Sequence, residues 1–298
     1  MKKITLISFV LPIFLSACLD NNNDDEIKNR PAKVVHVSNL ATLKNTLTPY
    51  QYTFDDWNNG IQEVPRLTFS GITPAWQKLI QSVPVENKKS IFFRLMLPSI
   101  LLSNEKILTE RAIVKEGNLQ SPALRRIALK YRVIKSEDAV LTDTQQQILL
   151  KRVNTIPPSL ALAQAAEESG WGTSRFVSEG NAFFGQWDFS GNGIKPKQQR
   201  KELGNYGIAR FESPLESVQA YMLNINTASA YQSLRDLRAQ RVKENKAVTG
   251  TLLAGTLLKY SERGEAYITG LRHLIAYNKL NAFDHVVLSD NQLLHLTF

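Results

Sequence analysis

The feature that most constrains the fold of this chain is the segment from Ile156 to Gly172. It starts with two prolines, continues mainly in alanine and leucine, and ends in Glu-Glu-Ser-Gly-Trp-Gly. Proline suits the first turn of a helix, alanine and leucine are strong helix formers, and glycine commonly ends a helix in the left-handed conformation. The segment therefore predicts a thin, tightly packable helix at the centre of the fold.

Two adjacent glutamates, Glu167 and Glu168, stand at the end of this helix. Successive residues diverge by about 100° around a helix axis, so only one of them can point into a given cleft. Glu168 follows Gln164 by one turn, whereas Glu167 lies on the other face, and both faces are apolar. Periodicity alone does not choose between the two carboxylates.

Further helices are expected from apolar periodicity. One begins near Glu86 and continues to about Leu108, and Pro98 should kink or restart it because proline lacks the amide hydrogen. Others are predicted over residues 123–133 and 143–153, and from the Pro157 segment to His285 the chain reads as mostly helix. Ser213 and Glu216 form a predicted capping box, followed by a structural apolar stripe at Val218, Tyr221, Met222 and Ile225.

Two short β segments interrupt this helical pattern. Val34 to Val37 reads as a strand, and the glycine-rich stretch from Asp188 to Arg210 reads as a hairpin. The predicted fold class is mainly α, with a small β-hairpin lobe. Residues 31–85 are expected to wrap onto a main domain at 86–298, since they are long for a loop and carry several large aromatic side chains.

The first residues predict export. A basic start and an apolar run from Ile4 to Leu15, too short to span a bilayer, are typical of a signal peptide. The following Leu-Ser-Ala-Cys resembles the lipobox of bacterial lipoproteins, which implies a signal peptide at 1–17, lipidation of Cys18, the only cysteine, and a polar lipidated tether at 18–30. The alternative is a plain signal peptide with an incidental cysteine. Leu19 in place of aspartate implies an outer-membrane lipoprotein facing the periplasm.

The net charge of the chain is +9, which falls to +7 when Lys2 and Lys3 leave with the leader. A basic surface suits nucleic acid, anionic lipid head groups or the carboxylate-bearing peptides of the bacterial wall, or serves solubility alone. Export argues against nucleic acid as a partner. The four histidines show no ligand spacing, so we expect no metal and no cofactor.

Residues 162–174 (LAQAAEESGWGTS) and 179–185 (EGNAFFG) resemble the bacterial glucosaminidase domain of glycoside hydrolase family 73, in particular its Bax-type branch. Family members read AQAxxESGWGxS and then xGNNxFG. The match continues in residues 88–93 and 259–268 and covers most of the chain from Lys88 onward. The resemblance implies a lysozyme-like helical domain whose β lobe lines a glycan-binding cleft.

The resemblance also implies the chemistry. The glutamate before Ser-Gly-Trp-Gly is the family's general acid and falls on Glu168, and Tyr260 lies in the tyrosine-bearing segment opposite it. A glutamate beside Trp171 and two phenylalanines would be partly desolvated, which raises its pKa and keeps it protonated for a leaving group. The implied enzyme is an endo-β-N-acetylglucosaminidase that cleaves the β-1,4 bond between N-acetylglucosamine and N-acetylmuramic acid of peptidoglycan.

The second catalytic group is left open by the sequence. Glu202 is the candidate carboxylate, but Gly207 stands where Bax-type sequences carry a glutamate. Without a second carboxylate, the substrate's own 2-acetamido group can act as nucleophile, with Tyr260 placed to stabilise the developing positive charge.

Substrate contacts are predicted around the acid and in the β lobe. Trp187 and Tyr206 could stack on sugar rings or belong to the core. Lys197, Arg200 and Lys201 could meet peptide carboxylates or form a solvated loop. The full set of predicted substrate-binding residues is Gln164, Trp171, Phe184, Gln186, Trp187, Tyr206 and Tyr267.

Two other functions compete with the glucosaminidase. A lytic transglycosylase also uses one helix-terminal Glu-Ser pair but leaves an anhydromuramic end. A non-catalytic lipoprotein that binds glycan and bridges membrane and wall is the alternative outside enzymes.

Overall fold

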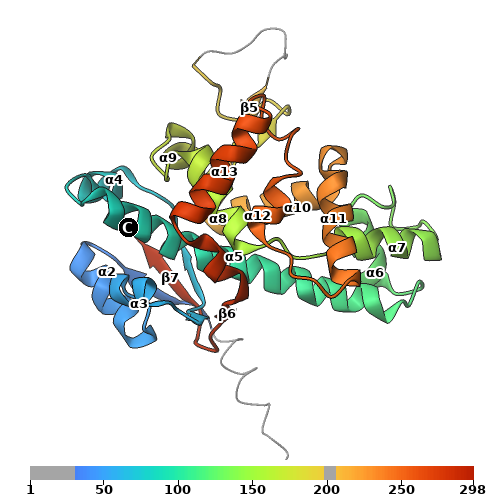
Figure 1. The fold of residues 1–298 in the computed structure, drawn as a ribbon, viewed down its shortest axis with the longest axis horizontal. Coiled ribbons are helices and arrows are strands. Elements are labelled where there is room, and N and C mark those ends of the chain that lie inside the picture. Colours follow the sequence, from blue (N-terminus) through green and yellow to red (C-terminus); the bar gives the residue numbers. More distant parts are fainter. Residues whose placement is uncertain (1–30, 198–205) are drawn as a thin grey trace, which may run out of the picture.

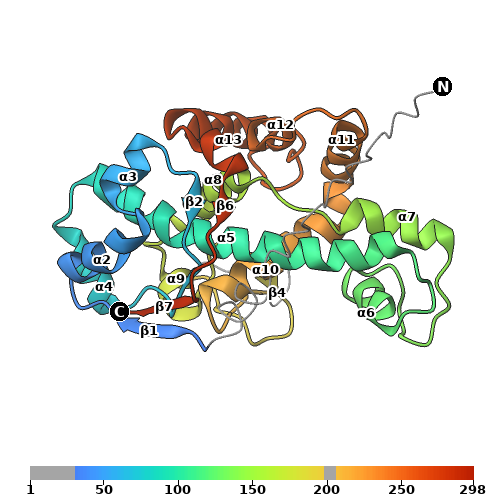
Figure 2. The ribbon, with the colours of Figure 1, turned by 90° about the horizontal axis from the view of Figure 1, so that it is seen from below.

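The longest element is helix α5 (Val85–Glu116), which runs along the molecule in Figure 2. The computed structural model describes residues 31–197 and 206–298. The expected restart of α5 at Pro98 is wrong, since the segment stays one helix on both sides of the proline. All residues from Ser90 to Leu101 are buried, so tertiary packing offsets the hydrogen bond that the proline removes.

Helix α8 (Pro158–Ser169) is central, as its sequence predicts. It packs against α5, α12 (Gly250–Ala254), α13 (Glu265–Tyr277) and the 3-10 helix η4 (Leu280–His285), an arrangement visible in Figure 1. Every residue from Pro158 to Ala166 is buried. The small side chains of its alanine-rich body allow four elements to surround one helix.

The N-terminus of α8 is held by a half-buried carboxylate on η4. Asp284 accepts hydrogen bonds from the Ser159 amide and hydroxyl, both at 2.8 Å, and from the Gly250 amide at 3.2 Å. These bonds satisfy amides at the first turns of α8 and α12 that have no partner within their own helices. One side chain therefore ties two helices to η4.

The remaining helices agree closely with the periodic pattern. The predicted helices at 123–133 and 143–153 correspond to α6 (Pro122–Lys130) and α7 (Asp143–Arg152). Ser213 caps α10 (Pro214–Thr227), but the reciprocal half of the expected capping box is wrong, since Glu216 accepts from the amide of Glu212 instead. The other elements of this half are α9 (Arg175–Gly180), η3 (Ser229–Tyr231) and α11 (Gln232–Lys243).

The two ends of the described chain meet in a parallel sheet. Strand β7 (Leu294–Thr297) lies between β1 (Lys33–His36) and β3 (Leu67–Phe69), and Leu294 pairs with both Lys33 and Leu67. Figure 2 shows β1 and β7 side by side. A second parallel pair joins β2 (Glu63–Val64) to β6 (Val287–Leu288). The helices of this N-terminal part are α2 (Leu40–Leu47), η1 (Thr48–Tyr50), α3 (Phe54–Asn59) and α4 (Pro74–Gln81).

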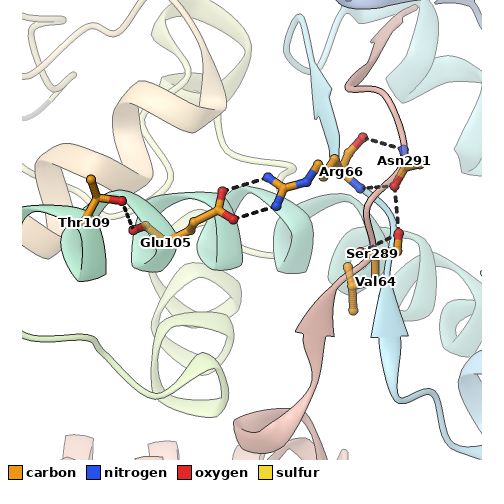
Figure 3. Close-up of polar contacts among 6 residues, drawn as sticks. All are labelled: Val64, Arg66, Glu105, Thr109, Ser289 and Asn291. Carbon is orange, nitrogen blue, oxygen red and sulfur yellow. Dashed lines mark hydrogen bonds and ion pairs between the residues drawn. The ribbon is translucent and has the colours of Figure 1, made fainter. Parts of the chain in front are cut away.

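A buried arginine fixes this sheet to α5, as drawn in Figure 3. The Arg66 guanidinium holds both carboxylate oxygens of Glu105, at 2.7 and 2.5 Å, while its backbone amide donates to Asn291 at 2.8 Å. Ser289 donates to the same Asn291 oxygen at 2.7 Å. A bidentate pair of this kind is directional as well as strong, so it sets the position of the sheet on the helix.

The β lobe contains strands β4 (Trp187–Asp188) and β5 (Gly207–Ile208), which pair antiparallel as the predicted hairpin requires. Ile194 forms an additional antiparallel bridge to Ile208. The mainly α class with a small β lobe is therefore confirmed. Among the described helices, none is long and apolar enough to cross a membrane.

Candidate active site

The C-terminus of α8 ends in three consecutive left-handed residues. Gly170, Trp171 and Gly172 have φ values of 56°, 59° and 77°. The Ser169 hydroxyl closes the turn by donating to the Ala165 carbonyl at 2.6 Å and accepting from the Gly172 amide at 2.8 Å. Glycine adopts this conformation without steric cost, whereas tryptophan rarely does, so the surrounding packing must hold Trp171 in place.

The two adjacent glutamates that precede the turn lie in different surroundings. Glu167 is exposed and forms an ion pair with Arg263 at 2.5 Å. Glu168 is half-buried, and its Oε1 accepts a hydrogen bond of 2.7 Å from the Tyr267 hydroxyl of α13. The tertiary structure thus distinguishes the carboxylates that helical periodicity leaves equivalent.

Burial is the main influence on Glu168, and it raises the pKa of this carboxyl above the ordinary value. The hydrogen bond from Tyr267 acts in the opposite direction by stabilising the carboxylate. The charge of Glu167 raises the pKa further and that of Arg263 lowers it. A raised pKa is what a general acid requires to stay protonated near neutral pH.

Two parallel tyrosine rings lie beside Glu168. Tyr267 is buried and stacks on Tyr260 with ring centroids 5.4 Å apart and planes within 6°. The Tyr260 hydroxyl donates to the Phe184 carbonyl at 3.3 Å. Of the two tyrosines, Tyr267 touches Glu168 directly, and Tyr260 lies behind its ring. Burial raises the pKa of both hydroxyls, so both remain neutral donors.

Four of the predicted substrate contacts have buried side chains: Gln164, Phe184, Tyr206 and Tyr267. Gln164 is fully buried and bonds to Tyr267 and Tyr221, and Phe184 is buried with its ring stacked on Tyr221 at 4.0 Å. Gln164 is linked to Glu168 through Tyr267, and Phe184 packs on the tyrosine that bonds to Gln164. A substrate reaches neither side chain in this structure, because neighbouring helices cover them.

The Trp171 side chain packs on α5. Its ring packs against Phe92 and Phe93 of α5, with centroids at 5.8 and 5.1 Å, and the Lys89 ammonium lies 5.3 Å from it. It lines an apolar cavity of about 230 Å³ together with Phe92 and Trp76. The residue therefore anchors the turn after α8 onto α5.

The exposed aromatic surface is on the β lobe. Trp187 is 48% exposed and stacks on Tyr206 at 5.0 Å, while Tyr206 itself is buried. Phe189, which the sequence reasoning missed, is 65% exposed and lies 5.9 Å from Trp187. The adjacent Gln186 is half-buried. Exposed neighbouring rings of this kind suit the apolar face of a sugar.

Gly207 is required by a close approach of two backbones. A Cβ atom at this position would lie 2.8 and 2.9 Å from the backbone carbons of Gly193. No other residue type fits without a shift of one of the two backbones.

Several predicted residues lie outside the described part of the chain. These are the lipidation site Cys18, the candidate carboxylate Glu202, and the basic residues Arg200 and Lys201. Lys197, the third member of the basic cluster, is exposed.

The chain is similar to known proteins over the region that contains α8 and α13. Residues 145–280 match the Glucosaminidase family model, described as mannosyl-glycoprotein endo-beta-N-acetylglucosaminidase, a span that includes both Glu168 and Tyr267. The chain is 37% identical over 187 residues to Protein bax of Escherichia coli (strain K12). The alignment covers 60% of this chain and 66% of that protein, just under two thirds of its length. No solved structure matches the chain.

Proposed function

We propose, from the premise that the chain contains a Bax-type glucosaminidase domain, that it hydrolyses peptidoglycan glycan strands. The bond cleaved is the β-1,4 linkage that follows N-acetylglucosamine and precedes N-acetylmuramic acid, and Glu168 is the general acid. The observation that carries the assignment is the half-buried Glu168 carboxyl at the end of α8, hydrogen-bonded to Tyr267 and distinct from the exposed, ion-paired Glu167.

The acid step follows from the environment of Glu168. Because burial raises its pKa, the carboxyl is protonated over a wider pH range than an exposed glutamate. It then donates its proton to the glycosidic oxygen as the bond to the anomeric carbon breaks. Tyr267 stabilises the carboxylate that remains through its hydrogen bond. Burial thus favours the protonated form of Glu168, and Tyr267 favours the charged form.

The group that acts on the anomeric carbon is the second part of the proposal. Gly207 has no side chain to offer there, and a Cβ atom at this position would meet the Gly193 backbone. We assign the role to the substrate's 2-acetamido group, an accepted exception to the two-carboxylate scheme. Glu202 is the competing candidate.

The location of the protein is also a proposal. The Leu-Ser-Ala-Cys sequence supports an outer-membrane lipoprotein anchored at Cys18 and facing the periplasm. Replacement of Cys18 by alanine should release the protein from the membrane fraction and abolish incorporation of radiolabelled fatty acid. Retention in the membrane with no labelling of the unaltered chain would contradict the anchor.

The function is tested by mass spectrometry of the fragments released from purified peptidoglycan. The chain without its leader should release fragments with N-acetylglucosamine at the reducing end, and its Glu168→Gln variant should release none. Glu167→Gln is the matched control and should behave as the unaltered protein. Anhydromuramic ends would instead identify a lytic transglycosylase, and binding to peptidoglycan without any release would identify a non-catalytic glycan-binding protein.

A further inference from the structure

A row of buried hydrogen bonds leads to Glu168 from the far side of α8. The Tyr221 hydroxyl of α10 donates to Gln164 Oε1 at 2.7 Å. Gln164 Nε2 donates to the Tyr267 hydroxyl at 3.0 Å, and Tyr267 donates to Glu168 Oε1 at 2.7 Å. The row joins three helices, α10, α8 and α13, and ends on the acid.

The side chains of this row are shielded from water. Gln164, Tyr221 and Tyr267 are 0%, 1% and 2% exposed. The Tyr221 ring is held by Phe184, with planes within 10°, and the Tyr267 ring by Tyr260. Buried polar groups of this kind must satisfy one another, because solvent cannot substitute for a lost partner.

The direction of each bond follows from the chemistry of the middle residue. A glutamine amide has an oxygen end that only accepts and a nitrogen end that only donates, while a tyrosine hydroxyl has one hydrogen to give. Because Tyr221 gives its hydrogen to Oε1, the nitrogen of Gln164 faces Tyr267. Tyr267 therefore accepts from the amide and has its hydrogen left for Glu168.

We propose that Tyr221 is a positioning residue that fixes the orientation of the Gln164 amide and thereby commits the Tyr267 hydrogen to the carboxylate of Glu168. The inference rests on the proposed function only in naming Glu168 the acid. Without the Tyr221 hydroxyl, Gln164 Oε1 has no donor, and rotation of the amide by half a turn gives it one, the hydroxyl of Tyr267. Tyr267 then donates to Gln164, and Glu168 loses the donor that stabilises its charged form.

The direction of the effect on Glu168 is set by the groups that face it. Burial and Glu167 raise its pKa, and Arg263 lowers it, and a substitution at Tyr221 alters none of these. Tyr231 and Tyr260 are neutral neighbours whose own pKa values are raised by burial. Loss of the Tyr267 bond therefore leaves the pKa of Glu168 higher than in the unaltered protein.

The test compares Tyr221→Phe with Tyr231→Phe in the full-length protein. Phenylalanine keeps the ring that stacks on Phe184 and removes only the hydroxyl. Titration of the glutamate carboxyl carbons by ¹³C NMR, with Glu168 assigned from Glu168→Gln, should show a higher Glu168 pKa in Tyr221→Phe. Tyr231→Phe, a buried tyrosine that is no part of the row, should leave the titration unchanged. An unchanged Glu168 titration in Tyr221→Phe, or an equal rise in both variants, would overturn the proposal.

A double variant distinguishes a change in the orientation of the Gln164 amide from general damage to the core. In Gln164→Met no amide remains to rotate, so adding Tyr221→Phe should produce no further change in the Glu168 titration. If Tyr221→Phe raises the pKa to the same extent with and without Gln164, the amide does not transmit the effect and the proposal fails.

Activity gives a readout that a purely structural role would not produce. Tyr221→Phe should lower kcat about tenfold, the equivalent of one hydrogen bond. The alkaline limb of the plot of kcat against pH should shift to higher pH. A fall in kcat with an unmoved limb would show a structural role only. If the unaltered protein cleaves no glycan while the carboxyl titration still shifts, the positioning role stands and the proposed function fails.

Discussion

The Tyr267 hydroxyl lies 2.7 Å from a carboxylate oxygen of Glu168, although 99 positions separate the two residues in the chain. This bond joins α13 to the end of α8 and opposes the effect of burial on the same carboxyl. Burial favours the protonated form of Glu168, and the hydrogen bond from Tyr267 favours its carboxylate form.

Replacement of Glu168 by glutamine should lower kcat by about 10² to 10⁴, the usual contribution of a general acid. Glutamine has the same shape but no proton of suitable acidity to donate. Glu167→Gln changes the neighbouring residue, which is exposed and paired with Arg263, and should stay within about threefold of the unaltered kcat. The rate at which soluble fragments are released from peptidoglycan measures kcat for both variants. Equal losses in the two variants would contradict the assignment.

The same substitution should change how stability depends on pH. Since the pKa of Glu168 is raised in the folded state, the stability this group contributes is fully present below its unfolded pKa and is lost as pH rises through the folded pKa. Glu168→Gln does not titrate. Its Tm should therefore match the unaltered protein near pH 4 and exceed it at pH 8. Parallel Tm profiles across this range would mean that burial does not raise the pKa.

Two tryptophans should respond differently to alanine. Trp187 is exposed on the β lobe, so Trp187→Ala should raise KM about three- to tenfold with little change in Tm, as expected for a sugar-stacking ring. Trp171 packs on Phe92 and Phe93, so Trp171→Ala should cost about 2 kcal/mol of stability. Kinetics and thermal unfolding of both variants provide the comparison, and an unchanged KM for Trp187→Ala would remove that residue from the binding surface.

Gly207→Ala should destabilise the β lobe by about 1–3 kcal/mol, because the added methyl would meet the Gly193 backbone. Gly270→Ala is the control on α13, where the new Cβ meets only a flexible arginine at 3.4 Å and alanine is the better helix former. Its stability should be equal or higher. Thermal unfolding and limited proteolysis of the lobe measure the difference, and a neutral Gly207→Ala would show that the strands can separate without cost.

Asp284→Asn should lower stability by about 2 kcal/mol, since an amide has one oxygen where the carboxylate uses two to hold Ser159 and Gly250. The control Asp236→Asn alters an exposed residue that pairs with Lys151, and should change stability by less than about 0.5 kcal/mol. Chemical denaturation compares the two. Similar losses would show that the link between α8, α12 and η4 contributes little.

The helices were largely predictable because their signals are local. Proline near the start, apolar spacing within the helix and glycine after its end correctly bounded α8, and the pattern at 143–153 placed α7 within one residue. The restart expected at Pro98 was wrong because a local rule takes no account of the packing that buries α5 on both sides of the proline. The strand at β1 was predicted, but its partner β7 was not, since 261 residues separate Lys33 from Leu294 and pairing at that distance leaves no local pattern.

At the active site, the sequence by itself determined a helix that ends in two glutamates before a glycine turn, and the family resemblance singled out Glu168. It could not determine which side chains surround that residue. Only the tertiary structure decided that Tyr267 contacts the acid, that Gln164 supports it from within the core, and that Trp171 faces α5. The reason is physical: backbone conformation follows from neighbouring residues, whereas the burial and hydrogen bonding of a carboxyl depend on helices that meet only when the chain folds.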